Sequence, residues 1–305
     1  MNIFSHLYST ALYNYCNHVY DARVNVFTPM DVHASRELIH ALVFDPKSGN
    51  WSRKWRTFPN MIYDRCRIQR SARFQQLLRF RERYKHLLFL NRPLRNKWTI
   101  HQTFSQRARF KQHMPETILY HSSIELRRML KQTPVVYIKP ANGTGGRGIL
   151  RIEKMKDKQG VFDIQGRRQD RRIIAPRKVS ASRLESIVRQ WCIGGSFLIQ
   201  QGIPLQLPGG RFHDYRMLVQ KNGQGVWELT GMAARVGAAR SITSNLHGGG
   251  HAVRAETLLK EWLGSTEKTE KVMITAEKLG LEAAVFLEES FGVLCELALD
   301  LAIDR

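Results

Sequence analysis

Apolar and polar residues alternate with the period of a β-strand over most of the chain after residue 134. Gly160, Gly166 and NGQG at 222–225 separate several of these stretches and are predicted as hairpin turns. The predicted strands are VVYIKP, GILRIEK, VFDIQG, RRIIAP, SFLIQQGIPL, YRMLVQK and VWELTGMAARV. Helical spacing of apolar residues occurs near 180–192 and across 266–290. The pattern predicts an α+β C-terminal half with antiparallel sheet.

The first 92 residues contain alternating strand and helix signals. Strands are predicted at ARVNVFTP (22–29) and in a segment that ends with MIYDR. DVHASRELIHALVF (31–44) has a helical period, with Asp31 as its N-cap. A basic amphipathic helix is predicted within 65–90, where the apolar positions are Phe74, Leu77, Leu78, Tyr84, Leu87 and Leu88. We therefore expect a small α/β domain at 1–92, and a second domain at 93–305 that begins with a turn at Pro93 and a helix.

The chain of 305 residues has a hydrophobic content of 43%, which is enough for one large core or several smaller ones. No apolar run reaches the roughly 18 residues that a membrane helix needs. The N-terminal segment lacks the pattern of a secretion signal, so we expect a cytoplasmic protein without a membrane span. The four cysteines lie far apart without C-x-x-C, which argues against a zinc site and against a disulfide framework.

The formal charge of +22 is unevenly distributed along the chain. Residues 51–112 hold 17 Lys and Arg against only Asp64 and Glu82. This segment is either an anion-attracting face for a nucleotide, a nucleic acid or an acidic polymer, or a solvated basic face without a partner.

A glycine-rich loop joins two of the predicted strands in VVYIKPANGTGGRGILRIEK (135–154). Gly143, Gly145 and Gly148 satisfy G-x-G-x-x-G, but a strand follows where a dinucleotide fold requires a helix. A Walker A loop is excluded because Ile and Leu follow Gly148. A kinase loop is excluded because Lys139 precedes the glycines. Backbone N–H groups of such a flap, with a lysine anchored on the preceding strand, suit a triphosphate.

Further motifs stand in a fixed order around this loop. They are FPNMIYDR, NKW with Lys97, MPET, FLIQQGIPL, DYRMLVQK, TGMAARVG, SNLHGGG and CELALDLAID. Together with KPANGTGGRGI they resemble the YheC/YheD endospore coat-associated family of the ATP-grasp superfamily. The resemblance runs from about residue 55 to the C-terminus. It implies an ATP-grasp fold at 93–305, with central and C-terminal subdomains, behind a small N-terminal α/β domain.

The resemblance also implies a set of site residues. Lys97 and Lys139 would hold the α and β phosphates, backbone groups from Gln201 to Ile203 would read the adenine edge, and Asp214 would help to bind the nucleotide. The flap would comprise Gly143, Thr144, Gly145, Gly146 and Gly148. Catalytic roles would fall to Arg216, Arg235 and Asn245, and a Mg²⁺ ion would be held by Asp300. The implied reaction activates a carboxylate with ATP to an acyl phosphate, which an amine then attacks.

Simpler interpretations exist for several of these residues. Asp214 and Arg216 lie two apart on one strand face and would then form only a surface ion pair. Asn245 and the glycines after it would form only a turn, because both residue types favour left-handed backbone. His247 and His251 are separated by glycines and do not suit a zinc pair on a helix.

The magnesium ligands of the superfamily should include an E-x-N about a dozen residues after Asp300, and no EVN occurs before Arg305. We expect either that the reading frame continues or that the protein is a truncated relative without catalysis. Two alternatives to a ligase therefore stand: a noncatalytic spore coat component that keeps the fold, and a nucleic-acid binder that uses the basic segment.

Overall fold

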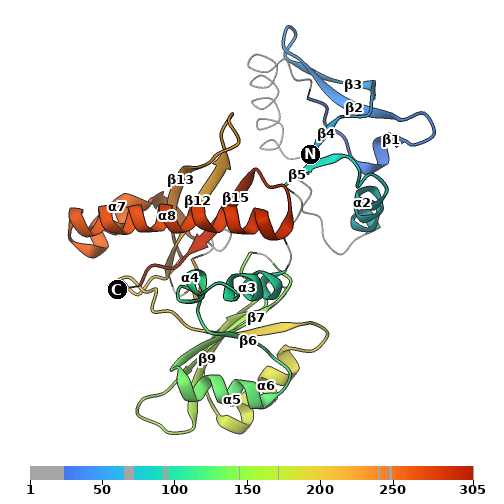
Figure 1. Ribbon diagram of the computed structural model, residues 1–305. Helices are drawn as coiled ribbons and strands as arrows, with labels where there is room; N and C mark the ends of the chain where they lie inside the picture. Colours follow the sequence, from blue (N-terminus) through green and yellow to red (C-terminus); the bar gives the residue numbers. More distant parts are fainter. Residues whose placement is uncertain are drawn as a thin grey trace. The chain divides into compact units, whose positions relative to one another are not determined.

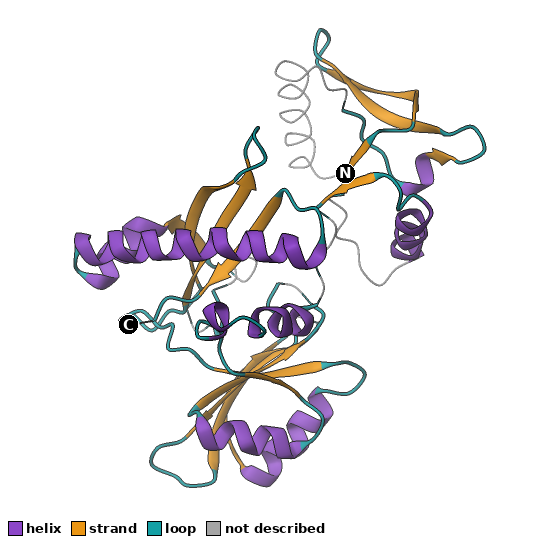
Figure 2. Ribbon diagram, in the orientation of Figure 1, coloured by secondary structure: helices purple, strands orange, loops and turns teal. Residues whose placement is uncertain are grey.

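The computed structural model describes residues 24–64, 72–91, 94, 96–143, 145–170, 172–239, 241–244, 246 and 249–304. Contacts divide the chain into two compact units, Met1–Arg92 and Pro93–Arg305, and we describe each by itself (Figures 1 and 2). Helices and strands are mixed in both units, so the fold class is α+β, as predicted. No helix in the described part of the chain is long and apolar enough to cross a membrane.

The first unit contains two small sheets. One is antiparallel and consists of β1 (Val32–His33), β2 (Leu38–Asp45) and β3 (Asn50–Thr57), which follow the 3-10 helix η1 (Pro29–Asp31). The other pairs β4 (Met61–Tyr63) with β5 (Leu88–Leu90) in parallel, and α2 (Ala72–Arg83) lies between them in the chain. Ile62, Phe80 and Phe89 form the core of this second part.

The predicted helix at 31–44 is wrong, because these residues form β1 and β2. Ile39 and Ala41 alternate with less buried neighbours and are fully buried on one face of β2. The Asp45 carboxylate accepts hydrogen bonds from Lys47 N and Ser48 Oγ, and the resulting turn sends the chain back as β3. Asp31 therefore ends η1, and does not begin a helix.

Two other predictions in this unit are only partly correct. In the strand predicted at 22–29, Val26 forms an isolated bridge with Leu42, and residues 22 and 23 lie outside the described residues. The basic helix is shorter than predicted, because α2 ends at Arg83 and Leu88 belongs to β5. The part of that prediction at 65–71 lies outside the described residues.

The second unit begins with α3 (Lys97–Ser105) and α4 (Ala108–Lys111) and contains a six-stranded antiparallel sheet. In the order β10-β9-β8-β7-β11-β6, its strands are Ile173–Ser180, Val161–Arg167, Ile149–Lys154, Val135–Pro140, Phe197–Gln201 and Thr117–Leu119. One face is covered by α5 (Ser123–Gln132) and α6 (Ala181–Trp191) (Figure 1). Ile138 and Leu150 are fully buried against these helices, so Tyr137 and Lys139 lie on the opposite face.

The sequence pattern missed α5 and misplaced one turn. A capping box marks the start of α5, since Ser122 N and Oγ both donate to the Glu125 carboxylate. Gly166 lies within β9 and pairs with Leu150, so its prediction as a turn is wrong. A Cβ there would lie 2.7 Å from the Ile149 carbonyl oxygen. Gly160 does lie in a turn, with φ of 75°.

A four-stranded antiparallel sheet completes the second unit, in the order β14-β13-β12-β15. Its strands are β12 (His213–Lys221), β13 (Trp227–Val236), β14 (His251–Arg254) and β15 (Glu296–Leu301). Helices α7 (Ala255–Leu263) and α8 (Thr266–Phe291) cover one face, where they bury Tyr215, Met217 and Val219 of β12 (Figure 2). The helices predicted at 180–192 and 266–290 are thereby confirmed as α6 and α8.

Candidate functional site

Two acidic and two basic side chains meet on the face of the second sheet that α7 and α8 leave free. Since Tyr215 and Met217 point into the core, Asp214 and Arg216 point to the opposite face of β12. The strand register places Arg235 of β13 directly opposite Asp214, and Asp300 of β15 directly opposite Arg216. The predicted residues Asp214, Arg216, Arg235 and Asp300 therefore form one cluster, which we call the ion-pair network.

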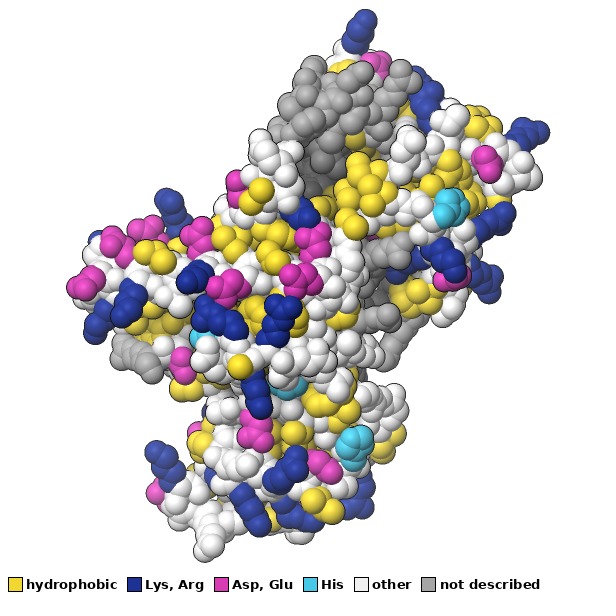
Figure 3. All heavy atoms as spheres, in the orientation of Figure 1, with side chains coloured by type: hydrophobic (Ala, Val, Ile, Leu, Met, Phe, Trp, Pro, Cys, Tyr) yellow, Lys and Arg dark blue, Asp and Glu magenta, His cyan; other side chains and the backbone are white. Residues whose placement is uncertain are grey.

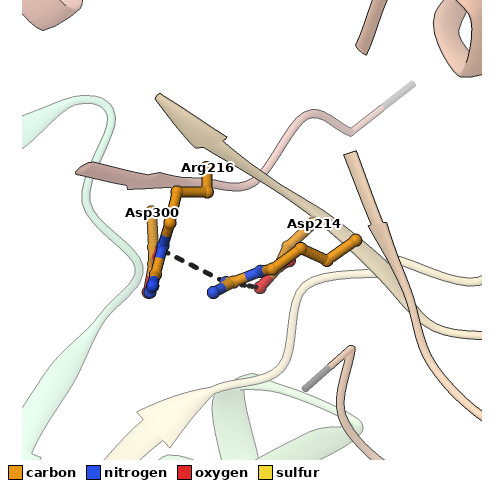
Figure 4. A network of polar contacts seen from close by, with 4 residues as sticks. Asp214, Arg216 and Asp300 are labelled. Atoms are coloured by element: carbon orange, nitrogen blue, oxygen red, sulfur yellow. Dashed lines mark hydrogen bonds and ion pairs between the residues drawn. The ribbon is translucent and has the colours of Figure 1, made fainter. Parts of the chain in front are cut away.

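The network is a chain of charge-assisted hydrogen bonds (Figure 4). Arg235 donates through Nε and Nη2 to the two oxygens of Asp214, and its Nη2 lies 3.2 Å from Asp300 Oδ1. Arg216 donates through Nε at 2.8 Å and Nη2 at 3.0 Å to the two oxygens of Asp300. Asp214 and Arg216 therefore each pair with a residue on a neighbouring strand. They do not pair with each other, contrary to the simpler interpretation of the sequence. Burial alone would lower the pKa of Arg235, but Asp214 and Asp300 raise it.

Lys139 lies on the free face of the six-stranded sheet, at the end of β7. Its Nζ donates to Gln200 Oε1 on the neighbouring strand β11, and Gln200 Nε2 donates to Thr117 Oγ1 at 2.9 Å. Burial lowers the pKa of Lys139 to about 8, and the charge of Lys97 acts in the same direction, while Asp214 and Asp300 act against it. The residues expected to surround a triphosphate, from both sheets and from α3, are therefore close enough to interact electrostatically.

Lys97 begins α3, where Asn96 caps the helix by accepting a hydrogen bond from Thr99 N. Its Nζ donates to the carbonyl oxygens of Pro140 at 3.1 Å and Gly143 at 2.6 Å. Burial of the ammonium group lowers the pKa of Lys97. Lys97 therefore contacts the first residues of the glycine loop, beside Lys139.

The backbone of the glycine loop between β7 and β8 favours glycine at three positions. Gly145, Gly146 and Gly148 have φ near 70°, a left-handed conformation that other residues rarely adopt. The carbonyl of Gly148 accepts a hydrogen bond from Trp191 Nε1 at 3.1 Å, which holds the end of the loop against α6. Thr144 lies outside the described residues.

The segment predicted to read adenine, 201–203, begins with the last residue of β11. The N–H groups of Gln201 and Gly202 donate to the carbonyls of Glu116 and Val135, both at 2.8 Å, so these two donors are used within the protein. The Ile203 carbonyl accepts from Leu205 N. Among hydrogen bonds of the described residues, the Ile203 N–H has no acceptor, so this donor is available to a ligand.

Asp300 fits a magnesium ion only as one ligand among several. Within the described ranges, no group of three or more His, Cys, Asp or Glu is arranged to hold a metal. Both oxygens of Asp300 accept from Arg216, although the carboxylate is 54% exposed. Magnesium commonly takes one or two protein carboxylates and completes its shell with phosphate oxygens and water. A single carboxylate suits Mg²⁺ here only where phosphate oxygens supply further ligands and Arg216 gives up at least one oxygen of Asp300.

Some predicted residues cannot be placed, and others were not predicted. Asn245, with His247 and Gly248 of the same loop, lies outside the described residues. Gln200, Tyr137 and Arg151 lie on the same sheet face as Lys139 but were not singled out from the sequence. The period-two alternation around Lys139 could have identified Tyr137 in the sequence, because residues two apart on a strand share a face.

Together, the two antiparallel sheets, the glycine loop and the paired lysines define an ATP-grasp protein. The YheC/D like ATP-grasp family model matches residues 86–305, and the chain belongs to that family. The family and fold predicted from the sequence are thereby confirmed.

Two curated relatives come from Bacillus subtilis (strain 168). The chain is 25% identical over 287 residues to endospore coat-associated protein YheC, which covers 92% of this chain and 76% of YheC. It is 25% identical over 284 residues to endospore coat-associated protein YheD, which covers 92% of this chain and 61% of YheD. The chain therefore spans less than two thirds of the length of YheD.

Solved structures of similar fold include D-cycloserine synthetase DcsG, with a TM-score of 0.44 and 11% identity over 76% of this chain and 67% of DcsG. The ATP-grasp ligase PsnB, complexed with minimal precursor, Mg and ADP, has a TM-score of 0.43 and 12% identity over 88% of this chain and 73% of PsnB.

Proposed function

We propose that the chain binds ATP between the two sheets of its second unit and uses it to join a carboxylate to an amine. The observation that carries this proposal is the geometry at the glycine loop, where Lys97 Nζ donates to the carbonyls of Pro140 and Gly143 and Lys139 ends the preceding strand on the same side of the loop. Two cations beside a glycine loop suit the phosphates, and the acidic side chains suit a counter-ion. Family membership supports the same assignment.

The reaction balances without any further reactant. A carboxylate oxygen attacks the γ phosphorus, the bond to the β-phosphate oxygen breaks, and ADP leaves with that electron pair. The amine nitrogen then attacks the acyl carbon, phosphate leaves, and the nitrogen loses a proton. Bound Mg²⁺, with Asp300 as a protein ligand, would supply charge neutralisation of the triphosphate.

The protein contributes fixed charges and hydrogen-bond donors. Lys97 and Lys139 hold phosphate oxygens, and N–H groups of the glycine loop close over them. Arg235 and Arg216 stabilise the negative charge that develops at the γ phosphate and the tetrahedral intermediate, because preorganised donors require no reorganisation. Asn245 is assigned to the same task, and Thr144 to the loop, on the family motif alone.

The biological setting is proposed from the relatives. YheC and YheD are described as endospore coat-associated, so we propose that this chain also acts at the spore coat during sporulation. Coat proteins are then candidate partners, whether the chain is a ligase or a noncatalytic coat component.

Binding and turnover test the proposal separately. We expect Lys139→Ala to weaken Mg-ATP binding by tenfold or more in calorimetry, because one charge-assisted contact contributes about 1.5–3 kcal/mol. Lys178→Ala is the matched control, since Lys178 is exposed on β10 of the same sheet. Equal affinities for wild type and Lys139→Ala would refute the nucleotide site.

A second assay mixes the chain and Mg-ATP with pooled carboxylic acids and amines. Release of ADP would indicate a ligase, whereas a noncatalytic coat component would bind ATP without releasing ADP. The nucleic-acid alternative predicts salt-sensitive DNA binding that Lys139→Ala leaves unchanged.

A further inference from the structure

The free face of the six-stranded sheet continues beyond Lys139 with two residues that the phosphate site does not use. Tyr137 lies two positions before Lys139 on β7 and shares its face. Arg151 of β8 is directly opposite Tyr137 in the strand register. A nucleotide whose phosphates lie at Lys139 therefore has this pair beside it on the same face.

Arg151 is unusually buried for an arginine. Only 7% of the residue is exposed. Its Nη1 lies 2.9 Å from Glu153 Oε2, but its Nε is buried and has no hydrogen-bond partner within the part of the chain that the structure describes. A buried guanidinium donor without an acceptor is costly, so such a group points to a ligand.

One aromatic ring and one tyrosine hydroxyl lie near this guanidinium group. Its central carbon lies 5.9 Å from the ring centroid of Phe212, which follows the segment proposed to read the base. The side chain of Tyr137, directly opposite on β7, hydrogen-bonds with Arg151, and Lys139 Nζ lies 5.4 Å from the centroid of the Tyr137 ring. A guanidinium group is planar and cationic, and both properties favour stacking on a flat π system such as a nucleobase.

The backbone places the base edge at the same position. Gln201 pairs with Val136, and Gly202 N donates to the Val135 carbonyl at 2.8 Å. The Ile203 N–H therefore lies near the β7 residues that precede Tyr137. A purine held by that N–H, with its phosphates at Lys139, passes over Tyr137 and Arg151, because two residues of a strand span about 6.6–6.8 Å.

We propose that Arg151 contacts the nucleobase, by stacking its guanidinium plane and donating its free Nε–H, and so makes the site selective for a nucleotide over a bare triphosphate. This inference rests on the proposed function and adds a specificity residue to it. Lys139 and Lys97 set the affinity for phosphate, and Arg151 sets the contribution of the base.

The test compares Mg-ATP with Mg-tripolyphosphate, which lacks base and sugar, in calorimetric titrations of the full chain. Arg151→Met keeps an unbranched side chain and removes the guanidinium group with its charge. We expect it to weaken ATP binding by about tenfold to thirtyfold while tripolyphosphate binding stays within about twofold. Arg177→Met is the control, because Arg177 is exposed on β10 of the same sheet.

A second pair of measurements does not depend on the folding of Arg151→Met. Arg151→Lys keeps the buried charge and loses the planar fork, so we expect it to lose ATP affinity by about threefold or more. In the wild type, the ¹⁵Nε signal that disappears in Arg151→Lys should shift with ATP and not with tripolyphosphate.

Each outcome decides one of the two proposals. A wild-type chain that binds neither ligand refutes the proposed function itself. A chain that binds ATP but shows equal losses for both ligands in Arg151→Met, or no loss at all, overturns the role of Arg151. An Nε signal that responds equally to both ligands overturns it as well.

Discussion

Arg235 and Arg216 carry the same charge and both pair with a carboxylate, but their surroundings differ. The side chain of Arg235 is 9% exposed and that of its partner Asp214 is 20% exposed. Arg216 and Asp300 are 48% and 54% exposed. Solvent screens the second pair, whereas removal of one partner from the first leaves a desolvated charge.

We therefore expect Asp214→Ala to lower the free energy of unfolding by about 3 kcal/mol, because Arg235 then keeps only its longer contact to Asp300. Arg216→Ala should lower it by about 1 kcal/mol at most. Urea titrations of the two variants at pH 7 compare them directly. Equal effects would show that burial of Arg235 does not govern the stability of this network.

The lowered pKa of Lys139 predicts a pH dependence of ATP binding. The free protein loses the Lys139 proton near pH 8, below its usual value of 10.5, and the triphosphate prefers the ammonium form. ATP affinity should therefore fall above about pH 8, by up to tenfold per pH unit. Titrations from pH 7 to 9.5 measure this, and Lys139→Arg, which stays charged, should remove the decline.

The same lowered pKa affects stability with the opposite sign. Between about pH 8 and 10.5 the unfolded chain holds this proton more tightly than the folded chain. The contribution of Lys139 to the free energy of unfolding therefore rises with pH over that interval. The binding measurement must accordingly be read at pH values where the folded fraction is unchanged.

At the scale of elements, α8 packs on β12 through a glycine. Gly280 is buried in the middle of this helix, and a Cβ there would lie 2.3 Å from Met217 Sδ and 3.6 Å from Leu299 Cδ1. Glycine costs about 1 kcal/mol in a helix interior relative to alanine. The close approach of helix and sheet offsets that cost, because it keeps the core behind the ion-pair network closely packed.

We expect Gly280→Ala to destabilise the chain by about 1–3 kcal/mol despite the better helix propensity of alanine, because the fully buried Met217 must move. Ile274→Ala is the control on the same helix, since Ile274 is 67% exposed. Thermal unfolding should leave this control nearly unchanged. A stabilised Gly280→Ala chain would mean that α8 shifts freely on the sheet.

At the scale of the whole molecule, the two units have separate cores. Phe89 packs with Ile62 and Phe80 in the first unit, and the cores of the second unit are built around Ile138 and Met217. The surplus of positive charge at 51–112 spans the end of one unit and the beginning of the other. Figure 3 shows Lys and Arg side chains on both units in one view, with acidic side chains among them.

Because the two units have separate cores, we expect one unit to unfold without the other. We expect Phe89→Ala to destabilise the first unit by about 3–5 kcal/mol and to accelerate amide hydrogen exchange in β4 and β5. Exchange in β7 and β8 should stay within about twofold of the wild type. Equal acceleration in both units would mean that they unfold together.

The sequence pattern predicted much of the second unit. In the first unit it predicted β4 and most of α2 but assigned a helix to residues 31–44, for a physical reason. After residue 134, period-two alternation extends over many strands, and glycines such as Gly160 and Gly225 mark some of their turns. At 31–44, Ile39, Leu42 and Val43 fit a helical period while Ile39 and Ala41 fit a strand. Pairing with β3 decides between them, and that partner supplies hydrogen bonds that a local pattern does not contain.

By itself, the sequence determined the order of strand, lysine, glycine loop and strand, because the turn chemistry of glycine and the period of a strand are local properties. Only the tertiary structure decided that Arg216 binds Asp300 and that Arg151 faces Tyr137. Residues 216 and 300 are 84 positions apart, and the register of β12 with β15 joins them. This register places the apolar residues of both strands against the covering helices. It therefore depends on contacts between segments that are far apart in the chain.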